Sequence, residues 1–235
     1  MRKTIYRAEE RGFANHGWLK TYHSFSFANY YDEDRMGFGR LRVLNDDQVE
    51  PGMGFGTHPH DNMEIISIPL DGIMAHKDSQ GNERTIEAGD IQVMSAGSGL
   101  THSEFNFSKE KKLSFLQLWI FPNVLNTTPY YDQRSFQFPV NNLILIVSPD
   151  ESGNSLPIKQ NAFLYLGKIQ KGISKKYERH SDRNGIFFFV IDGKISVENE
   201  SLHKRDAVGI ENTDQIEFYT EEDSYILIID VPMIE

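Results

Sequence analysis

The chain has 235 residues, of which 39% are hydrophobic and 25% charged, so it can bury the core of one large or two modest domains. It has no cysteine, which excludes disulfides and thiolate metal ligands and fits a reducing compartment. The formal net charge of −10 argues against direct binding of nucleic acid, because nucleic-acid binders usually present a basic face. The chain opens without a secretory signal pattern, and its apolar runs are too short for a membrane helix. We therefore expect a soluble, cytoplasmic protein with no membrane partner, and we expect it to be a monomer.

Short segments of alternating or β-branched apolar residues run along the whole chain, and helical periodicity is scarce. Gly and Asp/Asn turn signals separate these segments, as at Asp71-Gly72 and Asp192-Gly193. Many short strands at regular spacing are typical of an antiparallel sandwich or barrel, so we predict an all-β protein with few short helices. The main predicted strands are 41–44, 64–69, 91–94, 113–121, 143–147, 163–168, 185–191, 216–219 and 225–231.

A faint internal repeat relates residues 66–94 to residues 188–210. Both stretches read as a strand, an Asp-Gly turn, a strand, a polar hairpin, and then an Asp before another strand. The repeat predicts two similar β-domains in tandem. Pro, Asn and Thr cluster near the middle of the chain, so we place the domain boundary there, with an N-terminal domain at 1–135 and a C-terminal domain at 136–235.

The strongest chemical signal lies in residues 52–72, which read GMGFGTHPHDNMEIISIPLDG. His58 and His60 are two residues apart, and in a β-strand such a pair points to the same face. Glu64 lies four residues further on, and this even offset keeps it on that face if the strand continues without a bulge. The spacing therefore predicts two imidazoles inside one barrel, joined by a carboxylate if the strand is regular.

A second stretch, residues 89–106, ends in His102 and Glu104, again a same-face pair behind a Gly-rich turn. The chain between the two stretches has room for a hairpin, so the two strands can face each other. Three imidazoles and at least one carboxylate would then converge. Without thiolates, this donor set suits Fe(II), Mn(II), Ni(II), Cu(II) or Zn(II), with Co(II) also compatible.

The run SFSFANYYDEDRMGFGRLRVLNDDQVEPGMGFGTHPHDNMEI (24–65), together with MSAGSGLTHSEFN (94–106), resembles the pirin family of the cupin superfamily. It is most similar to the bacterial pirin-like proteins that are described as quercetin 2,3-dioxygenases. The two metal stretches match the first and second cupin motifs, with Ser95 where a proline is usual. The resemblance implies a bicupin, in which two antiparallel jelly-roll β-barrels pack face to face and only the N-terminal barrel holds a metal, most typically Fe(II).

The resemblance also implies a ligand set. The family's HPH and H-x-E motifs correspond to His58, His60, His102 and Glu104, all of which are present. Glu64 occupies the place of the usual cupin glutamate ligand, and the resemblance makes it a neighbour of the ligands instead, since Glu104 takes the carboxylate role. Both glutamates stay candidates for the catalytic base.

The second half of the repeat lacks a comparable set. When the Asp-Gly turns are aligned, Arg179 and Ser181 fall where the first histidine pair lies, and Phe218 and Thr220 fall where the H-x-E pair lies. His180 is one residue out of register and is expected to be a surface or hydrogen-bonded residue. We expect the second barrel to be structural or to modulate access to the first.

The resemblance implies a reaction. Four protein ligands on a six-coordinate metal leave two positions open, which suits a site where a substrate and O₂ meet. A flavonol such as quercetin would bind through its 3-hydroxyl oxygen, Glu104 or Glu64 would accept the hydroxyl proton, and the ring would be cleaved with release of carbon monoxide. Two alternatives stay open: an iron-dependent, redox-responsive regulator that binds a protein partner with little turnover, and a Zn(II) cupin isomerase or sugar-binding module.

Other polar and aromatic residues are expected to serve the fold. His16, His23, His76 and His203 lack partners at ligand spacing. Asp46 and Asp47 are neighbours, so their side chains should point to opposite faces of a strand, and we expect one turn residue and one solvated residue. A group of aromatics is expected in the core, although the resemblance would also allow a pocket for a flat aromatic substrate: Phe25, Phe27, Tyr30, Tyr31 and Phe38.

Overall fold

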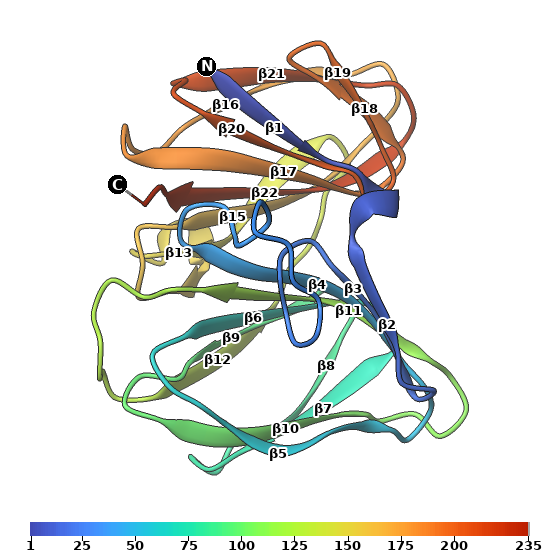
Figure 1. Ribbon diagram of the computed structural model, residues 1–235, viewed down its shortest axis with the longest axis vertical. Helices are drawn as coiled ribbons and strands as arrows, with labels where there is room; N and C mark the ends of the chain where they lie inside the picture. Colours follow the sequence, from blue (N-terminus) through green and yellow to red (C-terminus); the bar gives the residue numbers. More distant parts are fainter. Residues whose placement is uncertain (235) are drawn as a thin grey trace.

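The structure is a computed structural model in which residues 1–234 are described. This part of the chain is built almost entirely of strands, with two single-turn 3-10 helices, η1 (Ala8–Glu10) and η2 (Ser152–Asn154). Four sheets stack as layers, and the two outer layers have four strands each whereas the two inner layers have seven (Figure 1). No helix in residues 1–234 has both the length and the apolar character that a membrane crossing requires.

The N-terminal half forms two of these layers. The inner sheet contains, in spatial order, β12 (Tyr130–Ser135), β9 (Asp90–Ser95), β6 (Glu64–Asp71), β11 (Leu113–Ile120), β4 (Leu41–Val49), β3 (Leu19–His23) and β2 (Gly12–Asn15). The outer sheet contains β5 (Gly54–His60), β10 (Leu100–Asn106), β7 (Ile73–Asp78) and β8 (Glu83–Glu87). The two sheets enclose the interior into which the candidate ligands point.

The C-terminal half repeats this arrangement. Its inner sheet contains β1 (Arg2–Tyr6), β20 (Ala207–Glu211), β17 (Asn184–Asp192), β22 (Ser224–Pro232), β15 (Phe163–Ile169), β13 (Asn142–Ser148) and β14 (Leu156–Pro157). Its outer sheet contains β16 (Ser174–Glu178), β21 (Gln215–Thr220), β18 (Lys194–Val197) and β19 (Glu200–His203). The first strand, β1, crosses the division that we predicted, because it pairs with β20 of the other half.

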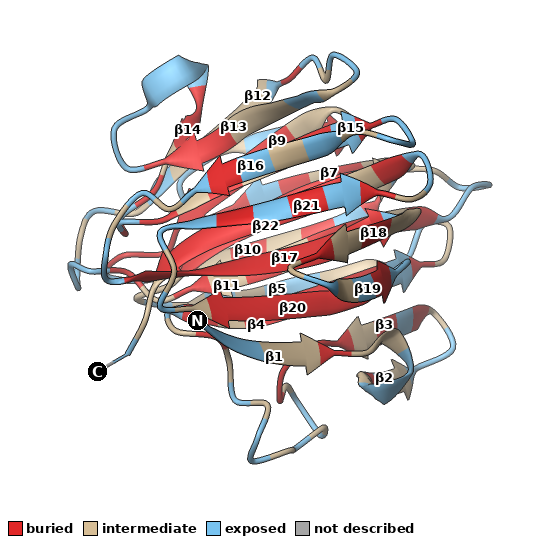
Figure 2. Cartoon of the chain, turned by 90° about the horizontal axis from the view of Figure 1, so that it is seen from above, coloured by how far each residue is buried: buried red, intermediate tan, exposed pale blue. Residues whose placement is uncertain are grey.

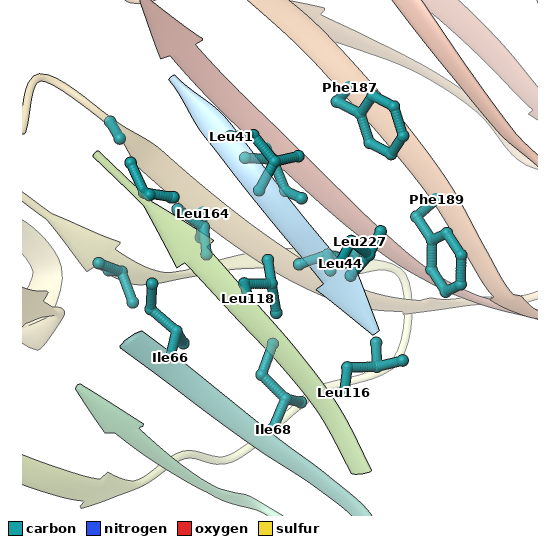
Figure 3. Packing of buried hydrophobic residues seen from close by; sticks show 14 of the residues in the cluster. Leu41, Leu44, Ile66, Ile68, Leu116, Leu118, Leu164, Phe187, Phe189 and Leu227 are labelled. Carbon is teal, nitrogen blue, oxygen red and sulfur yellow. The ribbon is translucent and has the colours of Figure 1, made fainter. Parts of the chain in front are cut away.

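The largest hydrophobic core lies between the two inner sheets (Figure 3), where side chains of β4, β6 and β11 meet those of β15, β17 and β22. In β17, Phe187 and Phe189 point into this shared core, whereas Ile186 and Phe188 point into the C-terminal barrel. A strand that is covered on both faces needs apolar residues at every position, which explains the continuous run in residues 185–191. Figure 2 shows that inner-sheet strands such as β17 and β22 are almost wholly buried, whereas outer-sheet strands such as β16 and β21 carry exposed residues as well.

The two Asp-Gly turns of the internal repeat have the same geometry in both halves. Gly72 and Gly193 have φ values of +85° and +89°, a region that other residues avoid. A Cβ on Gly72 would lie 2.7 Å from the carbonyl oxygen of Lys112, and a Cβ on Gly193 would overlap the carbonyl oxygen of Asp223. Each turn therefore requires glycine for its backbone angle and for its close neighbour.

The all-β class and the face-to-face bicupin arrangement are confirmed. Within the described strands, however, each barrel is made of two separate sheets that do not close into a continuous hydrogen-bonded cylinder. Residues equivalent to ligands in the C-terminal barrel serve its packing: Phe218 belongs to the apolar core, and the Thr220 hydroxyl donates to the Gln170 carbonyl oxygen.

Candidate metal centre

Strands β5 and β10 bring the two histidine stretches together. They are hydrogen-bonded antiparallel neighbours, and His102 lies directly opposite His58. Residues opposite each other in an antiparallel pair share one face of the sheet, so the i, i+2 spacing of His58 and His60 places all three imidazoles together. The predicted convergence of these histidines is found in the structure.

The three rings form a compact cluster of nitrogen donors. One ring nitrogen from each of His58, His60 and His102 lies within 4.8 Å of the others. The Nε2 atoms of His58 and His102 are 3.0 Å apart. Two nitrogen ligands at about 2.1 Å from one ion and at right angles to each other are separated by about 3.0 Å. The observed spacing therefore fits two donors to a single ion.

Burial favours the neutral form of two of these imidazoles, those of His60 and His102. Burial, with a smaller contribution from the neighbouring histidines, lowers the pKa of His60 to about 4 and that of His102 to about 2. A neutral imidazole is the form that ligates metals. The Nδ1 atom of His58 lies 2.7 Å from the Gly56 carbonyl oxygen, and donation of that N–H leaves Nε2 with its lone pair free toward the cluster.

Glu104 adds a buried carboxylate on the same strand as His102. Its register against β5 shifts after His102, so Glu104 pairs with Phe55 across a β-bulge. The Ser67 hydroxyl donates to Oε1 over 3.2 Å, and the Gln117 amide donates to Oε2 over 2.7 Å. Burial raises the pKa of Glu104, and these two donors partly oppose that rise.

The structure does not bring Glu64 to this cluster. Strand β5 ends at His60, and Glu64 begins β6, which belongs to the other sheet of the barrel. The continuous strand on which the same-face expectation depended is therefore absent. The carboxylate accepts hydrogen bonds from the Ser95 hydroxyl at 2.6 Å and from the backbone N–H of Lys159 at 3.1 Å. Glu64 thus links the N-terminal barrel to the C-terminal half.

His76 is a further buried residue of the site, and we expected it to be a packing or surface histidine. It lies opposite Glu104 across β7 and β10, and its ligand atom lies within 4.8 Å of those of His102 and Glu104. Its Nε2 is 3.3 Å from Asp78, and its Nδ1 has no hydrogen-bond partner among the described residues. The alternating pattern of residues 73–78 could have marked it as buried, but only strand pairing shows its neighbours.

A cavity of about 570 Å³ opens beside the cluster and is lined by His58, His60 and Glu104. This volume lies within the range of small-molecule sites. Its wall is largely aromatic and its remaining lining includes polar side chains from β3, β4 and β11. The aromatic lining consists of Phe13, Trp18, Phe27, Tyr30, Phe55 and Trp119. Phe27 and Tyr30, which we expected in the core, therefore line this cavity instead.

Asp46 and Asp47 differ from our expectation. Their side chains do point to opposite faces of β4, but both are buried, and neither is a turn or solvated residue. Asp46 forms ion pairs with Arg11 at 3.2 Å and with Arg205 at 2.8 Å. Asp47 lines the cavity.

Comparisons with known proteins agree with this fold and site. A family model described as Pirin matches residues 6–120, and one described as Quercetinase C-terminal cupin domain matches residues 145–231. The chain is 41% identical over 228 residues to a quercetin 2,3-dioxygenase from Escherichia coli strain K12, covering 97% of this chain and 98% of the relative.

Solved structures give the same result. The crystal structure of the bacterial pirin YhhW from Escherichia coli in complex with nickel(II) superposes with a TM-score of 0.95 at 39% identity, covering 99% of this chain and 100% of that one. A quercetin 2,3-dioxygenase from Acinetobacter baumannii has the same fold, with a TM-score of 0.80 at 21% identity over 97% of this chain and 85% of that one.

The stacked double barrel and the histidine cluster, together with these likenesses, define a bicupin metalloenzyme, a dioxygenase of the cupin type. More specifically, the chain belongs to the pirin family.

Proposed function

We propose that this protein cleaves the heterocyclic ring of a flavonol such as quercetin with O₂, releasing carbon monoxide. The observation that carries the proposal is the position of the histidine cluster and Glu104 at the wall of an aromatic-lined cavity. A flat polyphenol fits such a cavity, because aromatic side chains stack on aromatic rings. The names of the relatives support the same substrate class.

The metal ligands in this proposal are His58, His60, His102 and Glu104. Their neutral imidazoles and single carboxylate suit a divalent transition metal such as Fe(II) or Ni(II). When bound, the ion would supply Lewis-acid activation of the substrate oxygen and a place for O₂ beside it. A nickel(II) complex of a similar pirin supports the metal class.

Glu104 is the proposed general base. Its buried carboxyl group has a raised pKa, which brings its proton affinity closer to that of the hydroxyl that it deprotonates. The donors Ser67 and Gln117 fix the carboxylate plane, so a proton from a bound hydroxyl arrives at a group that is already oriented. Glu64 has no part in this step, because its carboxylate is engaged by Ser95 and Lys159.

The cavity positions the substrate and excludes water. The indole of Trp119 lies edge-on to His60 with ring centroids 4.9 Å apart, and Phe27 packs against the same indole at 5.3 Å. These rings form an apolar wall next to the ligands. In a dry site, the electrostatic interactions of Glu104 with a bound hydroxyl are stronger than in water.

The test is aerobic consumption of quercetin by the metal-loaded protein. We expect His60→Ala to reduce turnover by at least a hundredfold, because it removes one of the three clustered imidazoles. The exposed His203 provides a matched control, and His203→Ala should keep wild-type turnover. Equal turnover by wild type and His60→Ala, or no oxygen-dependent loss of quercetin by wild type, would contradict the proposal.

A further inference from the structure

The side chain of Asp47 lines the cavity but does not belong to the cluster of candidate metal ligands. It is 3% exposed and sits on β4 between two same-face neighbours, Asn45 and Val49. Its sequence neighbour Asp46 points to the opposite face, where Arg11 and Arg205 neutralise it. No cation pairs with Asp47 among the described residues.

The carboxyl group of Asp47 is incompletely satisfied. Its Oδ1 atom is buried without a hydrogen-bond partner in the described part of the chain. Burial raises the pKa of Asp47 to about 7; a side-chain hydrogen bond from Thr21 opposes that rise, and the nearby carboxylates of Asp46 and Glu104 add to it. An unpaired buried carboxyl group costs stability. Such a group is typical of a site where a ligand supplies the missing partner.

The strand pairing places Asp47 close to the reacting end of the cavity. Asp47 lies opposite Phe115 on β11, and Asn45 lies opposite Gln117. Gln117 holds the Glu104 carboxylate. Residues i and i+2 on a strand are about 7 Å apart, so Asp47 lies one side-chain row from the residue that orients Glu104. A flat ligand that reaches the histidine cluster can therefore also extend over Asp47.

We propose that Asp47 determines substrate specificity by accepting, at its carboxyl group, a hydrogen bond from a ring hydroxyl of the aromatic ligand. Its ligand class, a polyhydroxylated flat aromatic, rests on the proposed function. The aromatic wall holds the ring faces without regard to their substituents, whereas a buried acceptor distinguishes a hydroxylated ring from a bare one. A site built to bond a hydroxyl rejects analogues that lack it far more strongly than an apolar pocket does.

The test measures binding rather than turnover. The chain has two tryptophans, Trp18 and Trp119, and both line the cavity, so quenching of their fluorescence reports occupancy directly. Nickel(II)-loaded protein is titrated without oxygen with quercetin and with 3-hydroxyflavone, which keeps the 3-hydroxyl but lacks the others. The variants are Asp47→Leu and Asp47→Asn. Glu87→Gln, at an exposed carboxylate, is the control.

We expect Asp47→Leu to weaken quercetin binding about tenfold or more, in line with a lost hydrogen bond to a charged group. Binding of 3-hydroxyflavone should change less than twofold. Asp47→Asn, which keeps an acceptor without the charge, should fall between, and both variants should melt at or above the wild-type temperature because an unpaired buried carboxyl group is removed.

Three results would overturn the inference: unchanged quercetin affinity, an equal loss for both ligands, or a lower melting temperature in both variants. Failure of the proposed function is distinct from these outcomes. It would appear as quercetin that binds the wild type, with the selectivity described above, but is not consumed when oxygen is admitted.

Discussion

At the scale of single residues, burial shifts the pKa values of the buried imidazoles and of a nearby carboxyl group in opposite directions. It lowers the pKa of the His60 and His102 imidazoles, which favours the neutral form that can ligate a metal, and it raises the pKa of the Asp47 carboxyl group. In each case desolvation disfavours the charged form. The difference in sign follows from the charge of that form, which is positive for imidazole and negative for a carboxyl group.

Asp47 gives the stability of the protein a definite pH dependence. Its pKa is about 7 in the folded chain and 3.8 ordinarily, so the unfolded chain ionises first and this group's contribution to stability is lost as pH rises from about 4 through 7. The substitution Asp47→Asn removes this titratable carboxyl group. We therefore expect the variant to melt higher than wild type at pH 8 and to show little advantage at pH 4, measured by thermal unfolding followed by circular dichroism. An advantage that is equal at both pH values would contradict the raised pKa.

Residue spacing predicted which candidate donors on one strand share a face, but it does not specify every neighbour that strand pairing brings to the site. The i, i+2 rule gives two same-face pairs, His58 with His60 and His102 with Glu104, whereas Glu64 does not join them because the chain changes sheet within the three residues after His60. His76 could not be placed, since its contact with Glu104 arises from strand pairing. Pairing of distant strands leaves no local signature in the sequence.

At the scale of elements, the Asp-Gly turns connect corresponding strands in both barrels. The turn at Gly72 joins β6, in the inner sheet, to β7, in the outer sheet that contains His76. Its position therefore couples the two layers of the metal-binding barrel. The same turn at Gly193 joins β17 to β18, which explains why the repeat is visible in the sequence although the candidate ligands occur in one half only.

Alanine substitutions at Gly72 and Gly52 separate the cost of a positive φ from the cost of a close contact. In Gly72→Ala the backbone has a positive φ and the added Cβ would lie 2.7 Å from the Lys112 carbonyl oxygen. In Gly52→Ala the φ is +69°, but no atom lies within 4 Å of the added Cβ. We expect Gly52→Ala to cost about 1 kcal/mol, the penalty for a left-handed non-glycine residue, and Gly72→Ala to cost clearly more. Urea denaturation measures both, and equal losses would show that the contact has no energetic effect.

At the scale of the whole molecule, the two barrels share one core rather than touching as separate domains. The inner sheets meet through a continuous apolar cluster (Figure 3), and β1 carries the N-terminus into the C-terminal sheet. The all-β class and the tandem repeat were predictable from strand and turn patterns. The crossing of β1 was not, because a five-residue strand has no feature that specifies its partner.

A shared core predicts cooperative unfolding. Phe187 lies in the centre of this core and packs against Tyr6, Phe25 and Phe38 with ring centroids 5.2–5.5 Å apart. Phe187→Ala should cost about 3–5 kcal/mol, as for other large-to-small changes of a buried aromatic. Wild type and variant should each unfold in a single calorimetric transition. Two separate transitions in either protein would show that the halves are independent.

The central claim is that one metal centre in the N-terminal barrel consumes a flavonol with O₂. The most direct measurement determines metal content and oxygen-dependent loss of quercetin in the same samples, across a series loaded with increasing amounts of metal. The account predicts a turnover rate that rises in proportion to bound metal, reaches its maximum at one ion per chain and disappears without oxygen. Quercetin loss that is independent of bound metal, or that continues without oxygen, would contradict it.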